Sequence, residues 1–298
     1  MLSFAKRLIE WQLENGRHHL PWQVADPYRI WLSEIMLQQT QVSTVIPYFQ
    51  RFIERFPDVV SLAEAPQGDV LEAWAGLGYY ARARNLHRCA QTIASQFSGN
   101  FPDNATTLAT LPGIGRSTAA AIAAFGFGER AAILDGNVRR VLCRHFAVEG
   151  FPGEAAVQAR LWDIAEAELP LAKDITAYTQ GLMDLGSMVC TRRRPKCGDC
   201  PLNTTCLANR QGQTGMLPTP KPRKTIPQRE VAFLLLLHSE EGAQHWLLER
   251  RPQQGIWGGL LAPITLAEQH LQAEDVQDKL GPLLPSLGFC FLRCEEAP

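Results

Sequence analysis

Four closely spaced cysteines carry the clearest chemical signal in this chain. Eight cysteines are present, and four of them fall within 17 residues with the spacing C-x6-C-x2-C-x5-C; these are Cys190, Cys197, Cys200 and Cys206. The surrounding loop is basic and contains proline, and the chain shows no export signal, which argues for bound metal over disulfides. Zinc usually takes two paired C-x2-C knuckles, and this loop has one. Four unevenly spaced thiolates therefore favour a [4Fe–4S] cluster over zinc.

A second candidate for chemistry is Glu34, which lies in a segment that is otherwise apolar. Its neighbours include Trp31, Leu32, Ile35 and Met36, and such surroundings withdraw a carboxylate from water. Desolvation disfavours the charged form, so we expect a raised pKa and a proton held near neutral pH. The alternative is a glutamate on a narrow polar stripe at the surface of a helix.

Asp135 is the second candidate carboxylate, in the sequence Leu134-Asp-Gly-Asn137. It follows an alanine-rich segment that ends in glycines. An aspartate at such a position also commonly caps the N-terminus of the next helix. A capping aspartate in an ordinary turn therefore stays open as the alternative to a catalytic role.

The stretch before Asp135 predicts two helices joined by a tight glycine turn. Leu111-Pro-Gly-Ile-Gly-Arg116 separates a short helical run from the alanine-rich run 117–125. Pro112 ends the first helix, and the two glycines allow positive φ. We expect Ser117 or Thr118 to cap the second helix. Backbone N–H groups at a positive helix end suit a phosphate group, and an ordinary helix–turn–helix corner is the alternative.

Two further clusters have the composition of nucleic-acid contacts. Gln38-Gln-Thr-Gln41 places polar residues next to an apolar helix, and glutamine side chains read base edges by paired hydrogen bonds. Gly76-Leu-Gly-Tyr-Tyr-Ala-Arg-Ala-Arg84 combines tyrosines in a glycine turn with two arginines, which suits base stacking and phosphate binding. A solvent-facing helix end and a packing role for the tyrosines are the respective alternatives.

Helices must position most of these residues. Apolar residues between 27 and 56 recur at helical spacing, and prolines separate several further helical segments. No convincing strand precedes residue 230, so the first two-thirds of the chain is expected to be all-α. Residues 211–229 form a proline-rich, basic linker, and the segments 231–238 and 245–251 predict a β-hairpin.

Length and charge are those of a globular protein with local basic surfaces. The chain of 298 residues is long enough for two domains, and its formal charge is −1. No apolar run reaches the length of a membrane span and the first residues do not resemble a signal peptide, so we expect a cytoplasmic protein. Residues 76–146 carry eight basic and three acidic side chains, and residues 186–224 carry eight and one. Two such surfaces favour contact with phosphates over solvated charge alone.

The segments LPGIGRSTA and ILDGNVRR resemble the hairpin and the aspartate loop of the endonuclease III superfamily of DNA glycosylases. The similarity is closest to the A/G-specific adenine DNA glycosylases; it runs from about Leu20 to Cys206 and continues more weakly to about Pro263. The cysteine spacing is also that family's cluster signature. The resemblance implies a mainly α, two-lobed helix-hairpin-helix fold with an iron–sulfur loop and a cleft between the lobes. It places a six-helix barrel at about 23–130 and the second lobe in residues 1–22 and 131–210.

The resemblance also implies roles for individual residues. Glu34 would donate a proton to adenine N7, Asp135 would stabilise the oxocarbenium-like sugar, and Asn137 would hold Asp135 or the sugar. The DNA contacts implied are Gln39 and Tyr79 inserted into the duplex, Arg82 or Arg84 on the backbone, and the hairpin residues Gly113, Gly115 and Ser117. The cluster ligands implied are Cys190, Cys197, Cys200 and Cys206.

The implied activity is hydrolysis of the N-glycosidic bond of adenine mispaired with 8-oxoguanine or guanine in double-stranded DNA. A monomer would perform it, as the first step of base excision repair. A bifunctional glycosylase/lyase of the endonuclease III type is one alternative, but Ser117 stands where that enzyme needs a lysine nucleophile. A non-catalytic iron–sulfur DNA-binding protein is another, and the presence of both Glu34 and Asp135 argues against it.

The C-terminal region departs from the family pattern. Residues 230–298 begin like the family's α+β, Nudix-like domain, with Trp257-Gly-Gly259 as a recognisable turn. The segment 231–298 is well short of what that fold needs, and the Nudix glutamates and the family's Phe/Ser/His loop for 8-oxoguanine are missing from it. We therefore expect a short, incomplete Nudix-like region with weakened recognition of 8-oxoguanine.

Overall fold

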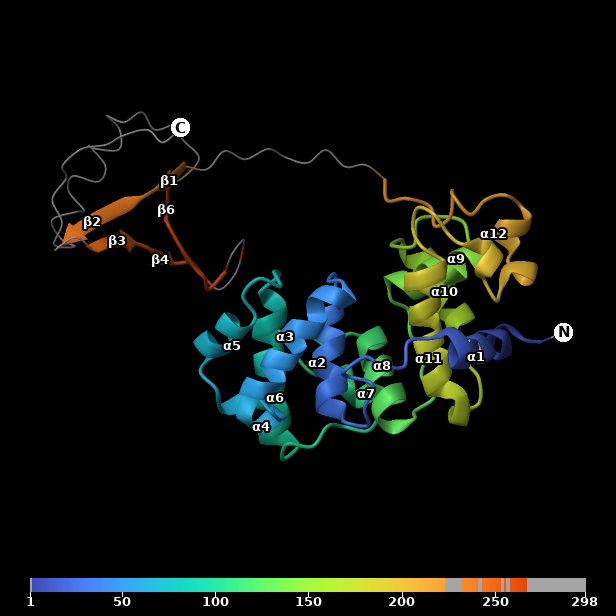
Figure 1. The fold of residues 1–298 in the computed structure, drawn as a ribbon, viewed down its shortest axis with the longest axis horizontal. Helices are drawn as coiled ribbons and strands as arrows, with labels where there is room; N and C mark the ends of the chain where they lie inside the picture. The colour runs from blue at the N-terminus through green and yellow to red at the C-terminus, as the bar shows by residue number, and fades with distance from the viewer. Residues whose placement is uncertain (1, 223–231, 241–242, 253–254, 256–257, 267–298) are drawn as a thin grey trace. The chain divides into compact units, whose positions relative to one another are not determined.

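The chain folds as two compact units. A computed structural model describes residues 2–222, 232–240, 243–252, 255 and 258–266. The first unit is Met1–Arg223 and the second is Lys224–Pro298. In Figure 1 the first unit is helical and the second carries the strands. The mainly α fold class predicted from the sequence is confirmed for the described residues.

One group of helices in the first unit packs around a core of large aromatic side chains. These helices are α2 (Pro27–Leu37), α3 (Val42–Arg55), α4 (Val59–Glu64), α5 (Gln67–Ala73), α6 (Ala81–Gln96), α7 (Ala105–Leu108) and α8 (Arg116–Phe127). Trp31, Phe49, Phe52 and Trp74 lie fully buried among them. Each helix therefore turns an apolar face inward, as the spacing of the sequence predicts.

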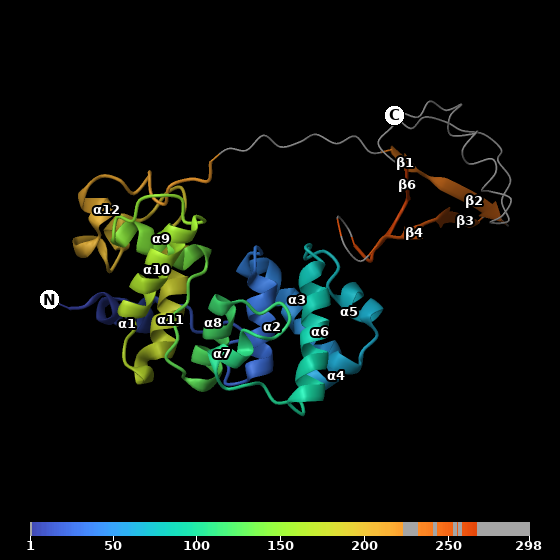
Figure 2. The ribbon, with the colours of Figure 1, turned by 180° about the vertical axis from the view of Figure 1, so that it is seen from behind.

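A second group of helices surrounds a separate core. It consists of α1 (Phe4–Asn15), α9 (Gly136–His145), α10 (Ala155–Ala167), α11 (Ile175–Asp184), α12 (Leu207–Arg210) and the short helical turns η1 (Ala172–Asp174), η2 (Leu185–Val189), η3 (Cys197–Asp199) and η4 (Asn203–Thr205). Figures 1 and 2 show α1 beside α11, although α2 follows α1 in the chain. The N-terminal helix therefore crosses over to the lobe that holds the cysteines.

The alanine-rich helix α8 is shared by the two cores. Ala119, Ile122 and Ala123 belong to the first core. The other face belongs to the second core and carries Ala120, Ala121 and Ala124. A helix that is buried on two opposite faces needs small side chains, because both neighbours must approach its backbone. The alanine run of the sequence therefore reflects this shared position as well as helix propensity.

The helical segment predicted at 27–56 is interrupted in the structure. α2 ends at Leu37, α3 begins at Val42, and Gln39 between them has a φ of 59°. The prediction of helix throughout this segment was wrong for the turn. Both helices pack against the same core, so apolar residues keep their helical spacing on both sides of the turn. That spacing therefore does not indicate the turn.

The glycine turn between α7 and α8 is present, with a different cap from the one predicted. Gly113 has a φ of 77°, whereas Gly115 has a φ of −87° and is the N-cap of α8. A Cβ atom on Gly113 would lie 2.7 Å from the Cβ of Asn85, so this position requires glycine for space as well as for conformation. The prediction that Ser117 or Thr118 caps α8 was therefore wrong.

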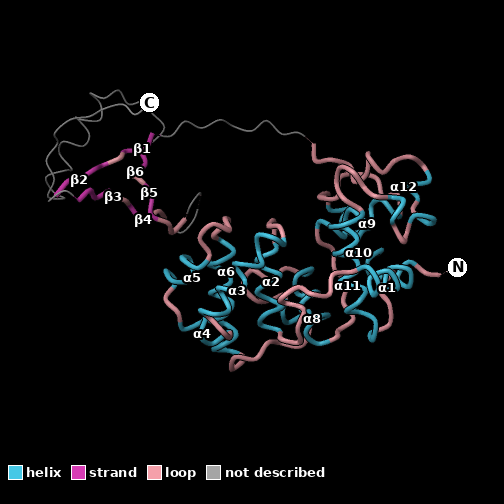
Figure 3. Tube along the Cα trace, viewed as in Figure 1, coloured by secondary structure: helices cyan, strands magenta, loops and turns pink. Residues whose placement is uncertain are grey.

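In the described residues, strands occur only in the second unit (Figure 3). β1 (Ala232–Leu234) pairs with β6 (Ile264–Leu266), β2 (Leu236–Glu240) with β3 (Ala243–Leu247), and β4 (Glu249–Arg250) with β5 (Leu261–Ala262), all antiparallel. The β2–β3 pair confirms a hairpin in this region, but with strands at 236–240 and 243–247, while β1 and β4, which lie within the predicted strands 231–238 and 245–251, pair with other strands. Trp257 and the tail 267–298 lie outside the described residues, and the Nudix-like assignment stays a prediction.

Within the described ranges, no helix is both long and apolar enough to cross a membrane.

Candidate active site and cluster loop

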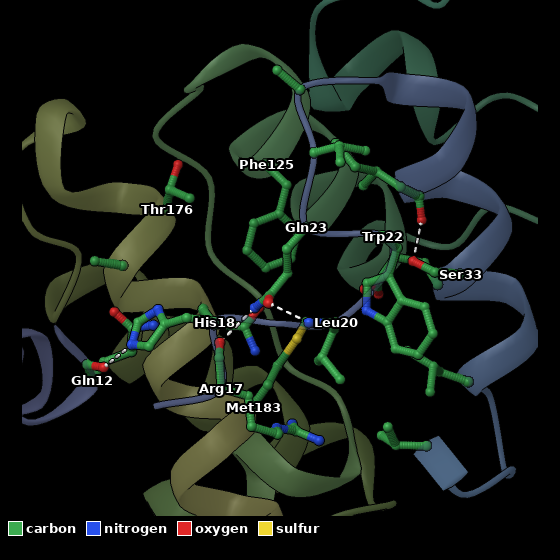
Figure 4. A pocket seen from close by; sticks show the side chains of 18 of the residues that line it. Gln12, Arg17, His18, Leu20, Trp22, Gln23, Ser33, Phe125, Thr176 and Met183 are labelled. Atoms are coloured by element: carbon green, nitrogen blue, oxygen red, sulfur yellow. Dashed lines mark hydrogen bonds between the residues drawn. The ribbon is translucent and has the colours of Figure 1, made fainter. Parts of the chain in front are cut away.

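A cavity of about 580 Å³ opens between α1 and α11 on one side and α2 on the other. Figure 4 shows the side chains around it: Arg17 and His18 from the loop after α1, Ser33 from α2, and Thr176 and Met183 from α11. Its walls therefore come from both helical groups. Such a concave site between two lobes is where a small ligand or an extruded base would bind.

Glu34 lines this cavity from α2 and is half-buried. Burial raises the pKa of its carboxyl group to about 8, and the negative charge of Asp135 contributes in the same direction. The desolvation predicted from the apolar neighbours of Glu34 is thereby confirmed. A carboxyl group with this pKa holds its proton at neutral pH and is available as an acid.

Asp135 is held at the N-terminus of α9, where its Oδ1 accepts a hydrogen bond of 2.7 Å from the N–H of Val138. Burial raises the pKa of Asp135, while the backbone N–H groups of Val138 and Asn137 lower it, followed by the charges of Arg140 and Arg139. Asp135 therefore caps a helix, as one interpretation of the sequence predicts, and its charge also acts on Glu34. Its catalytic role stays a prediction. Burial is the largest of these causes, so the pKa of Asp135 is raised overall, and the N–H groups and arginine charges limit that rise.

Side chains close to Asp135 make hydrogen bonds within α9 and to other segments. Ser117 Oγ accepts a hydrogen bond of 2.9 Å from the N–H of Leu134. Asn137 Oδ1 accepts one of 2.9 Å from Arg140 Nη2. Arg140 also donates to the carbonyl oxygens of Gly186 (2.6 Å) and Cys190 (2.7 Å). Ser117 therefore holds the backbone of Leu134, and Asn137 holds the side chain of Arg140.

The four cysteines of the loop line one cavity near the C-terminal end of α9. Arg144 lines it too, with Nη1 3.3 Å from Cys190 Sγ and hydrogen bonds to the carbonyl oxygens of Leu217 and Thr191. Among the described side chains, no group of three or more His, Cys, Asp or Glu is placed to hold a single metal ion. Four thiols that surround one cavity in a basic loop have the donor type and number that a [4Fe–4S] cluster takes.

The remaining cysteines of the described chain do not join this set. Cys89 on α6 and Cys143 on α9 are buried. Burial raises the pKa of Cys143 to about 11 and that of Cys89 to about 12. They are packing residues, as the sequence predicts.

The two residues predicted to enter the duplex, Gln39 and Tyr79, occupy two exposed turns. Gln39 lies in the turn between α2 and α3, and Tyr79 lies in the turn before α6, where its side chain is 65% exposed. Both have positive φ, 59° for Gln39 and 49° for Tyr79. The structure brings the two turns together through Arg82, whose guanidinium contacts both, and Arg84 follows half-buried on the same helix.

Sequence reasoning missed the ion pair that Arg17, a lining residue of the cavity, forms with Asp184. Arg17 Nη2 lies 2.6 Å from Oδ1 of Asp184, whose side chain is fully buried. The N–H of Arg17 and Nε2 of Gln180 also donate to this carboxylate, each at 2.9 Å. The partners are separated by 167 positions in the chain, and no local pattern relates them. The signal in the sequence that could have indicated this pair is Asp184, a lone aspartate within an otherwise apolar helix.

Comparisons with known proteins agree with this arrangement. The model of the family described as "HhH-GPD superfamily base excision DNA repair protein" matches residues 32–167. That of the "iron-sulfur binding domain of endonuclease III" matches residues 190–206, from the first loop cysteine to the last.

Individual relatives and solved structures are similar over most of the chain. The adenine DNA glycosylase of Buchnera aphidicola subsp. Acyrthosiphon pisum is 39% identical over 85% of this chain and 71% of that protein. That of Homo sapiens is 39% identical over 70% of this chain and 40% of its own length. A thermostable thymine-DNA glycosylase superposes with a TM-score of 0.62 at 26% identity, covering 70% of this chain and 95% of that chain. A non-covalent endonuclease III–DNA complex gives 0.59 at 19% identity over 71% and 99%, which shows a shared fold.

Proposed function

This chain belongs to the adenine DNA glycosylases of the HhH-GPD superfamily of base excision repair proteins, and we propose that it removes adenine mispaired with 8-oxoguanine or guanine. It is a DNA glycosylase, so the reaction is hydrolysis of an N-glycosidic bond. The observation that carries the assignment of residues is the pair of carboxyl groups, Glu34 and Asp135: both causes acting on Glu34 raise its pKa, whereas N–H groups and arginine charges oppose the effect of burial on Asp135.

Glu34 acts as the general acid. Adenine leaves poorly as an anion, so its departure requires a proton on the base, and Glu34 delivers this proton to N7. The adenine must first leave the base stack to reach the cavity. A pKa of about 8 keeps Glu34 protonated under neutral conditions, before the substrate arrives.

Asp135 acts on the sugar. Loss of the base leaves an oxocarbenium-like ring with positive charge, and an ionised carboxylate stabilises that charge. The amide donors of α9 support this form of Asp135 by lowering its pKa against the effect of burial. Asn137 contributes through its N–H group and by its bond to Arg140. Two carboxyl groups with separate affinities for protons thus divide the acid and charge-stabilising roles.

Double-stranded DNA is held by the exposed turns and the hairpin. Gln39 and Tyr79 enter the duplex beside the extruded adenine. The exposed N–H groups of Gly113 and Gly115 bind a phosphate at the start of α8, with Ser117 supporting the following loop. The donors of Arg82 face carbonyl oxygens of the protein, and we assign the contact with the DNA backbone to Arg84 on α6. We propose that the protein does this as a monomer in the bacterial cytoplasm, associated with the nucleoid.

A [4Fe–4S] cluster belongs to this family, and we assign its ligands to Cys190, Cys197, Cys200 and Cys206. When bound, the cluster organises a basic loop for DNA and takes no part in breaking the bond. Arg140 and Arg144 connect this loop to α9 through Cys190, so the loop also supports the helix that Asp135 caps. Iron and inorganic sulfide analysis of single Cys→Ser variants tests the assignment; zinc without sulfide in the unmodified protein would contradict it.

The bifunctional alternative is disfavoured by the environment of Ser117. A glycosylase/lyase needs a lysine amine at this position. Here the position holds a hydroxyl group that accepts the N–H of Leu134, next to Asp135. The side chain therefore has a structural partner in the position where the lyase needs its nucleophile.

The experiment that tests the proposed function is single-turnover release of adenine from duplexes with adenine opposite 8-oxoguanine or guanine. Glu34→Gln and Asp135→Asn should each abolish release, because one removes the proton donor and the other the compensating charge. Both variants should still bind the duplex, which separates chemistry from recognition. Near-normal turnover by either variant would remove that residue from the mechanism.

A further inference from the structure

Arg82 connects two segments that are distant in the sequence and adjacent in the structure. Its guanidinium reaches six oxygen acceptors: the carbonyls of Ile35, Met36, Gln38, Leu77 and Gly78, and Oγ1 of Thr40, at 2.6 to 3.4 Å. Nη1 donates to the end of α2 and the first residue of the turn that follows it. Nη2 donates to the turn before α6 and to Thr40. One planar group thus bonds to both exposed turns.

The two turns need such support because of their backbone conformation. Gln39 and Tyr79 have φ of 59° and 49°. Residues other than glycine, asparagine and aspartate rarely adopt such φ values, because the Cβ atom crowds the backbone. These conformations persist only where surrounding contacts impose them. The carbonyl oxygens that flank Gln39 and Tyr79, on Gln38 and Gly78, are among the acceptors of Arg82.

The geometry requires an arginine at position 82. A guanidinium presents donors along two edges of a rigid plane, whereas a lysine ammonium concentrates its donors on one atom. The guanidinium carbon also lies 5.2 Å from the ring centre of Trp74 and 5.7 Å from that of Tyr79, so cation–π contacts add to the hydrogen bonds. A lysine in its place keeps the charge but cannot bond to both turns at once, so neither turn is held continuously.

We propose that Arg82 is a positioning residue that presents Gln39 and Tyr79 to the duplex as a single rigid unit. This inference rests on the proposed function for the entry of the two side chains into DNA. Arg82 itself touches neither the adenine nor a phosphate in this role. The two insertions occur together because one guanidinium fixes both turns, so loss of Arg82 reduces the efficiency of base extrusion.

The first test needs no DNA. Hydrogen exchange of the free protein follows the amides of Thr40 and Leu77, which donate to Leu37 and Trp74 within the two turns. In Arg82→Lys, both amides should exchange at least about 10-fold faster, together, while core amides stay protected. Arg88→Lys, the same change at an exposed site on the same helix, should leave both amides unchanged. Unchanged exchange in folded Arg82→Lys, or acceleration in one turn alone, would overturn the proposal.

The second test separates positioning from a phosphate contact. Arg82→Lys should lower single-turnover adenine release by about 100-fold, the scale of a misplacement near 1 Å. In a protein that already carries Gln39→Ala and Tyr79→Ala, Arg82→Lys should lower the rate of adenine release little further, because its effect passes through those two side chains. The salt dependence of DNA binding should keep its slope in Arg82→Gln, which removes the charge that a phosphate contact would use. Additive effects of Arg82→Lys in the two backgrounds, with a slope reduced by about 0.9 in Arg82→Gln, would identify a phosphate contact instead.

These outcomes distinguish the inference from the proposed function. If the unmodified protein releases no adenine, the function is wrong, and the exchange experiment still decides whether Arg82 fixes both turns. If release is normal in Arg82→Lys while the Gln39→Ala, Tyr79→Ala protein is impaired, the inference alone fails. Arg82→Gln keeps two N–H donors without the charge and replaces Arg82→Lys if that variant does not fold.

Discussion

At the scale of single residues, the two candidate carboxyl groups, Glu34 and Asp135, differ in what surrounds them. Both causes acting on Glu34 raise its pKa, whereas hydrogen-bond donors and arginine charges oppose the burial of Asp135. The sequence predicted the first effect, because the apolar neighbours of Glu34 adjoin it in the chain. It did not reveal the mutual influence of the two groups, which arises only when α2 and the start of α9 come together.

We expect the rate of adenine release to fall as the pH rises through about 8, because Glu34 then loses the proton that it donates. Single-turnover rates measured with saturating enzyme between pH 6 and 9 check this. Duplex binding measured over the same range is the control, since loss of binding would imitate loss of chemistry. A rate that stays constant through pH 9 would contradict the role of Glu34 as the acid.

Glu34→Gln should be more stable than the unmodified protein at pH 8. The folded protein holds a proton on Glu34 up to about 8, whereas the ordinary value for glutamate is 4.5. Between these values the folded state binds more protons than the unfolded state, so stability falls as the pH rises. Glu34→Gln does not undergo this loss of stability. The excess of its free energy of unfolding over that of the unmodified protein should grow from pH 5 to pH 8 and be absent below pH 4.5.

Urea unfolding at pH 5, 6.5 and 8 measures this difference. Glu54→Gln, at an exposed position of α3, is the control. An advantage for Glu34→Gln that is independent of pH would mean that packing, and not protonation, causes it.

At the scale of elements, helix α8 and the loop before α9 decide what chemistry the site performs. The sequence predicted the short helix, the glycine turn and the alanine helix, because proline, glycine and alanine act locally. It misplaced the cap of α8, since the hydroxyl of Ser117 bonds to Leu134 and not to its own helix. A contact between two segments overrode a local preference there.

Ser117→Lys should introduce an amine where the bifunctional enzymes need one. We expect borohydride to trap this variant on DNA through residue 117, and the unmodified protein not to be trapped there. Adenine release by the variant should also fall, because lysine cannot accept the N–H of Leu134 that Ser117 binds. Ser117→Ala isolates that second effect without adding an amine. Strong trapping of the unmodified protein would favour the bifunctional alternative.

At the scale of the whole molecule, the candidate active site lies in one of the two units. Residues 1–223 contain both helical cores, the cavity, the two carboxyl groups and the four loop cysteines. The second unit shows paired strands with several exposed apolar side chains; these include Phe233, Leu235, Leu237 and Trp246. The change in pattern near residue 230 made this division predictable, whereas the way α1 joins the second core depends on contacts across the chain.

A protein limited to residues 1–223 should therefore fold and release adenine opposite guanine at a rate within about threefold of the full chain, as expected for a unit with its own core. Preference for 8-oxoguanine over guanine should be equal or lower. Rates on the two duplexes, measured side by side for both proteins, test this. Failure of residues 1–223 to release adenine, with the cluster present and the helices folded, would place part of the active site in the second unit.

The position of α8 also bears on which mutations this enzyme tolerates. α2, which carries Glu34, packs on one side of α8, and α11 packs on the other. Alanine predominates on both faces of α8, so its neighbours pack close to its backbone. The thickness of this helix therefore sets the spacing between α2 and α11, which line opposite sides of the cavity. A valine at Ala121 or Ala123 would push these neighbours apart, and the shape of the cavity would change even where the fold survives.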